Sequence, residues 1–412
     1  MNNQKVTDRY RKSEADFSRT SPLSFPVVVS SVLHLFKESV EFNLQKILPE
    51  LKTEVVTGSA FTQARYKIRA DFFKELAKTT VLAYDDWDLR LWKGHRLIAG
   101  DGSTLNLPIT KDTLNHFGLY SQGEKGRRTC LARVFFLYDL LNDIIVHSEL
   151  STMKTGEKAL LMKGLPQIND HNDIYILDRG FGHFCTLVEL MQNQKKFCVR
   201  IQRETNFAKS IMKKKSNDQI FDWTPSKKEI ENASKNKLSY KPIKIRIVKV
   251  KLPSGEIELL ATNLLNQNKY NTHDVGMLYR YRWGVEEGFK KLKPKMKIEQ
   301  FGCRKSEGII QEFYAHIFCF NMISLAGSIA NQMIDQNTRH RKTKYKFNWQ
   351  NAYRFFREKI LRLIALRERI ETVIDDLINQ ITASITAIRP GRRFIRDMRH
   401  KNKQRRLTQL FK

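Results

Sequence analysis

The feature that most constrains the fold of this chain is a change of hydrophobic period near residue 95. Before it, apolar residues recur at helical spacing; after it, they alternate as in strands. Three successive segments carry the strand pattern, and a turn-forming Asn142-Asp143 pair separates the last two: residues 95–107, 129–141 and 144–151. We expect an antiparallel meander.

The next hundred residues alternate between helical and strand patterns. A helix is predicted over 156–165, a buried strand over 173–178, a helix over 183–192 and a strand over 197–202. Three hairpin-like strands followed by strand–helix–strand predict an α/β protein with a mixed sheet flanked by helices. This is the order of a ribonuclease-H-like domain.

A polar, Lys-rich segment over 206–266 interrupts this plan. It ends in two strand patterns, 243–251 and 256–262, joined by a turn, so we expect a mainly β insertion. The chain is mostly helical afterwards. The predicted helices cover 274–292, 307–333 and 348–388.

The N-terminal region is predicted to be helical, with one helix over 24–48 and another over 62–76. The polar face of the second carries Arg65, Lys67, Arg69 and Lys74, which suits either a helix-turn-helix DNA reader or a solvated amphipathic helix. We divide the chain into a DNA-binding N-terminal region, two parts of a catalytic core around the insertion, and a C-terminal region with a basic tail: 1–92, 93–205, 206–266, 267–333 and 334–412.

The charge of the chain favours a polyanionic partner. Lys and Arg number 73 against 43 Asp and Glu, a net charge of +30. Residues 389–412 alone hold ten Lys or Arg and one Asp. Such a surplus suits a nucleic-acid phosphate backbone, although a basic but ordinary enzyme with solvated Lys-rich surfaces is the alternative.

The cysteine pattern and the N-terminus bear on the compartment. Five cysteines without a Cys-x-x-Cys pair fit neither a disulfide framework nor a thiolate zinc site. We see no apolar signal core at the N-terminus, and charges interrupt each apolar run. We expect a cytoplasmic protein without membrane spans.

The densest chemical signal lies in residues 279–293. At 100° per residue, Tyr279, Arg282, Glu286 and Lys293 fall within an arc of roughly 60° on one helix. An exposed, salt-bridged helix face would look the same. Pro294 predicts a kink near Lys293.

Two further carboxylates lie where strands would present them. Asp101 lies within the first predicted strand, and Asp178 ends the buried strand, although either could cap a turn instead. Three carboxylates suit a pair of Mg²⁺ ions that assist phosphodiester displacement. The lack of a His and Cys cluster argues against zinc, and the lack of a Gly-x4-Gly-Lys-Ser/Thr loop argues against ATP.

These residues together resemble a known family. The Tyr-x2-Arg-x3-Glu-x6-Lys spacing of Tyr279 to Lys293 is similar to the signature of bacterial DDE transposases of the insertion-sequence-four type. The segments 101–103 (Asp-Gly-Ser) and 178–181 (Asp-Arg-Gly-Phe) resemble the other two catalytic segments of that family. The similarity extends over most of residues 58–400.

The resemblance implies roles for single residues. Asp101, Asp178 and Glu286 would bind two Mg²⁺ ions, for which Mn²⁺ can substitute, and Glu286 keeps the signature spacing that Glu287 does not. Tyr279, Arg282 and Lys293 would contact DNA phosphates. Trp283 would stack on a base displaced at a DNA hairpin, a role that some relatives share with a second Trp. Trp223 is the candidate for that second position, but we expect it in the core.

The implied function is cut-and-paste transposition of an insertion sequence. Hydrolytic nicking, hairpin formation and strand transfer would take place at terminal inverted repeats, on a homodimer that binds double-stranded transposon ends and target DNA. We expect a bacterial, nucleoid-associated protein. The alternatives are an inactive or domesticated DNA-binding derivative and another ribonuclease-H-like metal nuclease, such as a resolvase.

Overall fold

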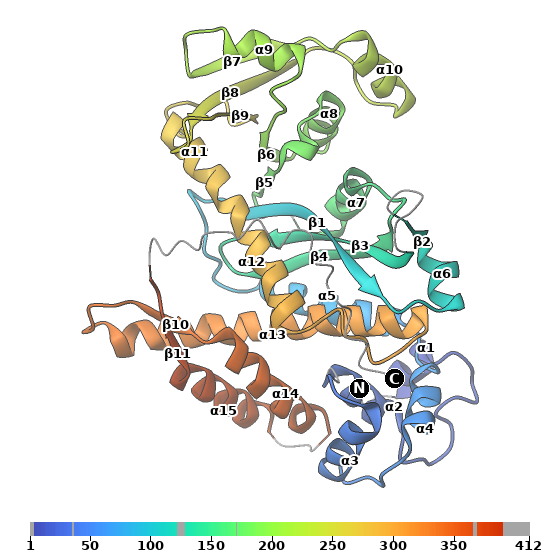
Figure 1. Cartoon of the computed structure of the whole chain (residues 1–412). Helices are drawn as coiled ribbons and strands as arrows, with labels where there is room; N and C mark the ends of the chain where they lie inside the picture. Colours follow the sequence, from blue (N-terminus) through green and yellow to red (C-terminus); the bar gives the residue numbers. More distant parts are fainter. Residues whose placement is uncertain (1–3, 35–36, 122–127, 170, 366–368, 390–412) are drawn as a thin grey trace. The chain divides into compact units, whose positions relative to one another are not determined.

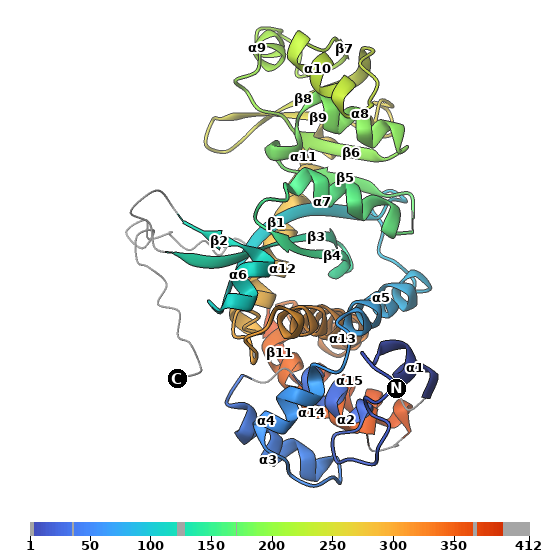
Figure 2. The same cartoon turned by 90° about the vertical axis from the view of Figure 1, so that its right-hand side faces the viewer.

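The computed structural model describes residues 4–34, 37–121, 128–169, 171–365 and 369–389. The basic tail predicted from Arg389 therefore lies, apart from that residue, outside the described part. The chain divides into two compact units, which Figures 1 and 2 show from two sides. We call residues 85–104 and 133–290 the sheet unit, and the described parts of residues 1–84, 105–132 and 291–412 the helical unit.

The sheet unit is built on a mixed sheet (Figure 1). Its neighbouring strands follow the order β4-β3-β1-β5-β6-β9-β8-β7. The pairs β1–β5 and β5–β6 are parallel, whereas β6–β9, β9–β8 and β8–β7 are antiparallel. The strands are β1 (Leu97–Leu107), β3 (Thr129–Asp139), β4 (Ile144–Thr152), β5 (Ile174–Leu177), β6 (Lys196–Arg200), β7 (Asp218–Trp223), β8 (Ile243–Lys251) and β9 (Ile257–Thr262).

Helices flank this mixed sheet, which confirms the predicted α/β class. All four residues of β5 are fully buried, as expected for a central parallel strand. Leu278 and Val275 of the helix α11 join a core cluster with Ile174 and Ile176 of this strand. The helices of the unit are α7 (Glu157–Gly164), α8 (Phe184–Gln192), α9 (Asn206–Met212), α10 (Lys227–Lys235), α11 (Thr272–Arg280) and α12 (Gly284–Lys290).

The insertion at 206–266 differs from its prediction. The expected hairpin is present as β8 and β9, but the segment also contains α9, α10 and the strand β7. β9 pairs with β6, so the insertion extends the same sheet. Arg246 of β8 is fully buried in an ion pair with Asp218 of β7, the strand that the sequence pattern did not predict.

The continuous helix predicted over 274–292 is interrupted. α11 ends at Arg280, a 3₁₀ turn covers Tyr281–Trp283, and α12 follows. A π-helical turn at Lys291–Lys295 then contains Pro294, where the kink was predicted. Proline cannot donate the backbone hydrogen bond of an α-helix, and wider turns accommodate that loss. The four signature residues therefore do not share one regular helix face.

The helical unit is organised around the 33-residue helix α13 (Ser306–Thr338). It packs against α2, α14, α15 and the strand β10. The other elements of this unit are α1 (Gln4–Tyr10), α2 (Phe25–Leu33), α3 (Val40–Glu50), α4 (Gly58–Arg65), α5 (Asp71–Asp85), α6 (Lys111–Phe117), β2 (Leu119–Tyr120), β10 (Tyr345–Phe347), α14 (Trp349–Ala365), α15 (Ile370–Ala383) and β11 (Ile385–Ala387).

Helix α13 is long and apolar enough to cross a membrane by length and composition. However, 78% of its most apolar window is buried inside the protein, as in the core helix of a soluble protein. The five cysteines are free and buried.

Three long helices predicted in the terminal regions are each divided in two. The predicted helix 62–76 is α4 and α5, which are separated at residues 66–70. Arg65 does not lie on a solvated face, because its guanidinium is buried against the Glu312 carboxylate at 2.8 Å. The predictions over 24–48 and 348–388 likewise correspond to α2 with α3 and to α14 with α15.

Candidate active site

Two carboxylates lie where the paired part of β1 and β5 ends. The parallel ladder of β1 and β5 pairs Ala99 with Ile176 and Gly100 with Leu177. Asp101 and Asp178 are the next residues on each strand, and neighbouring strands lie about 4.8 Å apart. Asp178 also caps the 3₁₀ turn that follows it, since its Oδ1 accepts from Gly180 N at 2.8 Å, whereas Asp101 Oδ1 accepts from Gly102 N at 2.9 Å within β1.

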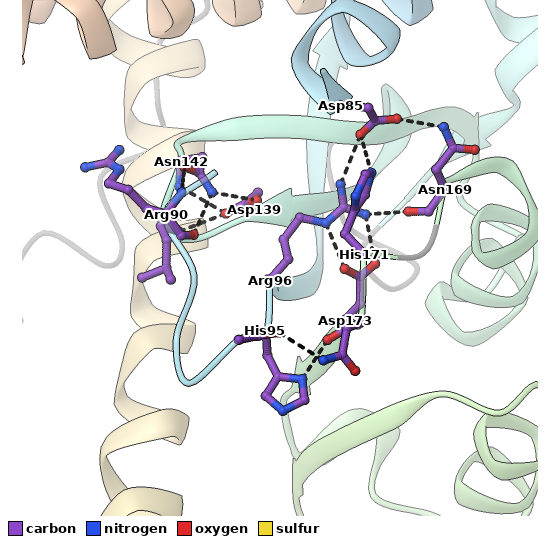
Figure 3. A network of polar contacts seen from close by, with 12 residues as sticks. Asp85, Arg90, His95, Arg96, Asp139, Asn142, Asn169, His171 and Asp173 are labelled. Carbon is purple, nitrogen blue, oxygen red and sulfur yellow. Dashed lines mark hydrogen bonds and ion pairs between the residues drawn. The ribbon is translucent and has the colours of Figure 1, made fainter. Parts of the chain in front are cut away.

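A buried network holds the opposite ends of the same two strands (Figure 3). Arg96, just before β1, donates from Nε and Nη2 to the two oxygens of Asp173, just before β5, both at 2.8 Å. Its Nη1 contacts Asp85 at 3.3 Å, and His171 Nε2 lies 2.9 Å from the same Asp85 oxygen. Bidentate Arg–carboxylate pairs fix geometry as well as charge, so this network sets the register that places Asp101 beside Asp178.

Glu286 is presented by a helix that packs against β3. Phe289 of α12 stacks on Phe136 of β3, with ring centroids 4.7 Å apart. A Cβ at Gly288 would come within 3.1 Å of the Tyr138 ring, so the helix backbone approaches the strand closely. This packing leaves the Glu286 side chain partly exposed, at 31%.

Arg282 connects Glu286 with Asp101. Its Nη2 contacts Glu286 Oε1 at 3.3 Å, and its positive charge acts to lower the pKa of Asp101. The residue is 9% exposed, and its Nε has no hydrogen-bond partner among the described residues. Its guanidinium lies 4.7 Å from the ring centroid of Trp283. A buried cation with an unused donor is suited to bind an anionic ligand.

The electrostatics of Asp101 are those of a crowded acidic site. The pKa of Asp101 is raised from 3.8 to about 6, chiefly by burial. The Gly102 hydrogen bond and the charge of Arg282 act to lower this pKa, and the charges of Asp178 and Glu157 act to raise it. Burial, and then the charge of Asp178, also raises the pKa of Glu157. Sequence reasoning missed Glu157, because it belongs to no motif and only the fold brings it here.

The other predicted residues are placed differently. Tyr279 lies in the core cluster with 5% exposure, and burial raises its pKa well above the usual range. Trp283 is 56% exposed. Trp223 is buried and stacked on Phe207 at 4.0 Å, as the core placement predicted for it requires. Lys293 lies in the π-helical turn and belongs to the helical unit.

The donor set is compatible with a hard divalent cation. Asp101, Asp178 and Glu286 offer carboxylate oxygens, the ligands that Mg²⁺ prefers. Among the described residues, no group of three or more His, Cys, Asp or Glu side chains is already assembled for a metal. The Glu286 carboxylate is paired with Arg282 Nη2 at 3.3 Å.

Comparison with known proteins relates the chain to transposases. Residues 92–322, more than half of the chain, match the model of a family described as "Transposase DDE domain". This region contains Asp101, Asp178, Glu286 and Arg282.

One relative and one solved structure are similar over large parts of the chain. Transposase InsG for the insertion sequence element IS4 of Escherichia coli K12 is 21% identical over 277 residues, which span 65% of this chain and 60% of that protein. A piggyBac transposase synaptic complex with hairpin DNA matches with a TM-score of 0.45 and 11% identity, over 92% of this chain and 80% of that one.

Proposed function

The chain belongs to the DDE transposase family, and from this premise we propose that it is a transposase that excises and inserts an insertion sequence through metal-dependent cleavage of DNA. The substrate is double-stranded DNA with terminal inverted repeats, and the product joins target DNA. The reaction sequence proposed is hydrolytic nicking, hairpin formation, hairpin opening and strand transfer.

The main observation in support of this proposal is the position of Asp101 and Asp178 on two paired strands. The β1–β5 register places Asp101 and Asp178 one residue beyond the last pair of this parallel ladder, where β5 ends, inside the region that matches the family. The ends of parallel strands are the usual place for a functional site in an α/β sheet. Burial of Asp101 beside another carboxylate is costly without a bound cation, which favours a functional explanation over a structural one.

We assign cation binding and phosphate binding to different residues of the chain. Asp101, Asp178 and Glu286 would hold two Mg²⁺ ions, or Mn²⁺ in their place. Bound there, the cations supply charge stabilisation and an activated nucleophile for phosphodiester displacement. Arg282 has an unused donor with which to bind a phosphate near the cleaved bond, and we assign further phosphate contacts to Tyr279 and Lys293.

Trp283 fits the hairpin step. A tight DNA hairpin requires a base to leave the stack, and an exposed aromatic ring can hold that base. Trp283 is exposed and adjoins Arg282, so the base and its neighbouring phosphate would be held together. The charge of +30 suits binding of both transposon ends and target, which we propose takes place on a homodimer.

The test uses end-labelled DNA from the flanks of the coding region, chosen for short imperfect inverted repeats. The full-length protein is incubated with Mg²⁺, and products are separated on denaturing gels that resolve nicks, hairpins and joined strands. Asp101→Asn, Asp178→Asn and Glu286→Gln should each lose end cleavage by at least about 10³-fold while retaining DNA binding.

Glu287→Gln is the matched control, because Glu287 is adjacent in sequence, 63% exposed and paired with the exposed Lys290. It should cleave like the unchanged protein. Binding without any cleavage by the unchanged protein would support an inactive derivative. Cleavage that persists in all three carboxylate variants would overturn the site assignment, and cleavage without hairpins or joined strands would indicate a simpler nuclease.

A further inference from the structure

Arg200 occupies the position next to Asp178 on the neighbouring strand. The parallel ladder of β5 and β6 ends with the pair Leu177 and Val199, and Asp178 and Arg200 are the next residues. The backbone of Asp178 is still extended, at φ −77° and ψ 178°, so the alternation of side chains continues through it. Because the β1–β5 ladder also ends at Leu177, three adjacent strands bring Asp101, Asp178 and Arg200 to one level of the sheet.

The core below this level shows which face of the sheet Asp178 and Arg200 share. Ile176 and Cys198 are a registered pair, and both pack in the core cluster with Tyr279 of α11. Asp178 and Arg200 lie two residues further along the same strands, and side chains two residues apart point to the same face. Both residues therefore belong to the sheet face against which α11 packs.

The surroundings of Tyr279 also bring Arg200 and Arg282 to one place. The pKa of Tyr279 is raised chiefly by burial, while the positive charges of Arg282 and Arg200 act to lower it and the charge of Glu258 acts to raise it. Arg282 is nine-tenths buried, and its Nε has no hydrogen-bond partner among the described residues. Two guanidinium groups thus lie near Tyr279, and one of them has a buried donor for an anionic ligand.

Two carboxylates of the insertion hold the Arg200 guanidinium. Glu258 Oε1 lies 2.8 Å from Nη1, and Glu256 Oε1 lies 3.4 Å from Nη2. Arg200 is paired with Leu260 of β9, so Glu258 lies two residues along that strand on the same face. Glu258 is the closer partner and is 12% exposed, whereas Glu256 is 45% exposed and also contacts Arg203 at 3.5 Å. A guanidinium has five N–H donors, so further donors remain for a ligand.

We propose that Glu258 is a positioning residue of the active site, which holds Arg200 beside Asp178 so that the Arg200 guanidinium binds a DNA phosphate next to the cleaved bond. The assignment rests on the proposed function and deepens it, because it gives the insertion a part in the reaction. An arginine can bind a phosphate through two parallel N–H donors. The alternative is a cross-strand ion pair that only holds β9 against β6.

The primary experiment measures the single-turnover rate of end cleavage by the full-length protein with Mg²⁺, at saturating protein. Arg200→Gln should slow cleavage roughly 10- to 150-fold, as expected for loss of a hydrogen bond to a charged group. Glu258→Gln keeps the size of the side chain but not its charge, and should slow cleavage at least about 5-fold. The dissociation constant for end DNA, measured by fluorescence anisotropy, should change less than about 3-fold in both variants.

Arg203→Gln and Glu189→Gln are the matched controls. Arg203 contacts Glu256 as Arg200 does, but it is 42% exposed. Glu189 is 25% exposed and pairs with Lys158 at 3.4 Å elsewhere in the sheet unit. Both variants should cleave end DNA at the rate of the unchanged protein. A comparable loss in either control would show that removal of any ion pair in this unit slows cleavage, and the proposal would be wrong.

End DNA with single methylphosphonate groups separates phosphate binding from a structural role. Each such group replaces one phosphate that flanks the cleaved bond by a neutral group. On the DNA that lacks the phosphate bound by Arg200, Arg200→Gln and Glu258→Gln should slow cleavage by less than about 2-fold, because the contact is already lost. A purely structural ion pair would give the same loss on every DNA. Equal losses on the unmodified DNA and on all the methylphosphonate DNAs would overturn the proposal.

The double variant Arg200→Gln with Glu258→Gln tests whether Glu258 acts through Arg200. It should cleave no more slowly than Arg200→Gln alone, and losses that multiply would contradict the proposal. The double variant also takes the place of Arg200→Gln if that single variant, which leaves Glu258 without its cation, does not fold. Urea denaturation followed by circular dichroism checks that each variant is folded under the assay conditions.

Asp101→Asn distinguishes failure of this inference from failure of the proposed function. If the unchanged protein cleaves end DNA, Asp101→Asn does not, and Arg200→Gln and Glu258→Gln cleave like the controls, the inference is wrong and the aspartate site stands. If the unchanged protein with Mg²⁺ does not cleave end DNA, the proposed function is wrong and this inference with it.

Discussion

Asp101 and Asp178 each follow by one residue the last registered pair of the β1–β5 ladder, Gly100 and Leu177. The other end of this short ladder is held by the buried pair of Arg96 and Asp173. Because side chains alternate between the faces of a sheet, a slip of one residue would turn Asp178 away from Asp101. A charge pair far from the reacting atoms thus determines the geometry of the carboxylates.

Arg96→Met tests the energetic weight of that pair. The substitution would leave the Asp173 carboxylate buried at 0% exposure without its cation, and breaking a buried pair in this way costs about 3–5 kcal/mol. The free energy of unfolding should fall by that amount in urea denaturation followed by circular dichroism. Arg203→Met is the control, because Arg203 and its partner Glu256 are both more than 40% exposed, and it should change stability by less than about 0.5 kcal/mol.

Asp101→Asn should change how stability depends on pH. Between pH 3.8 and about 6 the folded protein retains a proton on Asp101 that the unfolded chain has lost, so the stability of the cation-free protein falls as pH rises through this interval. The Asp101→Asn variant has no such carboxyl group, so its stability should not fall for this reason as pH rises. In chelator at pH 7.5 it should be more stable than the unchanged protein, by on the order of 3 kcal/mol, and near pH 3 the two should agree.

With divalent cations present, the unchanged protein should be more stable than the Asp101→Asn variant. A cation competes with the proton on Asp101, so Mn²⁺ affinity should rise as pH increases through about 6, and saturating Mn²⁺ should stabilise only the unchanged protein. Thermal unfolding measured with and without Mn²⁺ at several pH values gives the stabilisation by Mn²⁺ and, from its concentration dependence, the Mn²⁺ affinity. A pH-independent affinity would show that Asp101 does not bind the cation.

Most strands of the sheet could be predicted from the sequence, for identifiable physical reasons. β5 is fully buried, so its apolar run and the Asp that ends it were visible without a structure. The elements that were missed depend on distant contacts. The strand β7 pairs its Asp218 with the buried Arg246 of β8, and the carboxyl group of Glu157 lies against Gly102.

Helix ends and helix faces were the least predictable features. The signature residues Tyr279 and Arg282 were expected on one polar face, but a 3₁₀ turn begins between them at Tyr281. Tyr279 consequently packs in the core, whereas Arg282 faces Glu286. Arg65 was expected on a polar helix face, for DNA or for solvent, but it is buried and donates to Glu312, 247 residues away in sequence.

Trp283→Ala and Trp223→Ala should have opposite phenotypes. Trp283 is 56% exposed, so its loss should leave stability within about 0.5 kcal/mol but slow hairpin formation roughly 5- to 150-fold, as removal of about 1–3 kcal/mol of base stacking requires. Nicking should remain. Trp223 is stacked on Phe207 in the core, so its loss should cost about 3–5 kcal/mol of stability.

Trp87→Ala is the control for the exposed tryptophan. Trp87 is 38% exposed in the same unit, and its replacement should affect neither stability nor the hairpin yield on denaturing gels. Hairpin yields that match between Trp283→Ala and Trp87→Ala would exclude a base-stacking role for Trp283.

Arg282→Ala and truncation after Arg389 should have different effects, because we expect Arg282 to serve end cleavage and the basic tail to serve DNA binding. Arg282 lies beside Glu286, so its loss should reduce end cleavage while the dissociation constant for end DNA changes little. Residues after Arg389 carry nine Lys or Arg and one Asp, and their removal should weaken binding. The slope of log K against log salt should flatten by about 0.9 for each DNA phosphate that the tail neutralises. Fluorescence anisotropy across a salt series measures the slope.

Arg280→Ala, an exposed neighbour on α11, is the control for cleavage. Equal losses of binding from the Arg282 variant and the truncation would show that the phosphate contacts are not divided in this way.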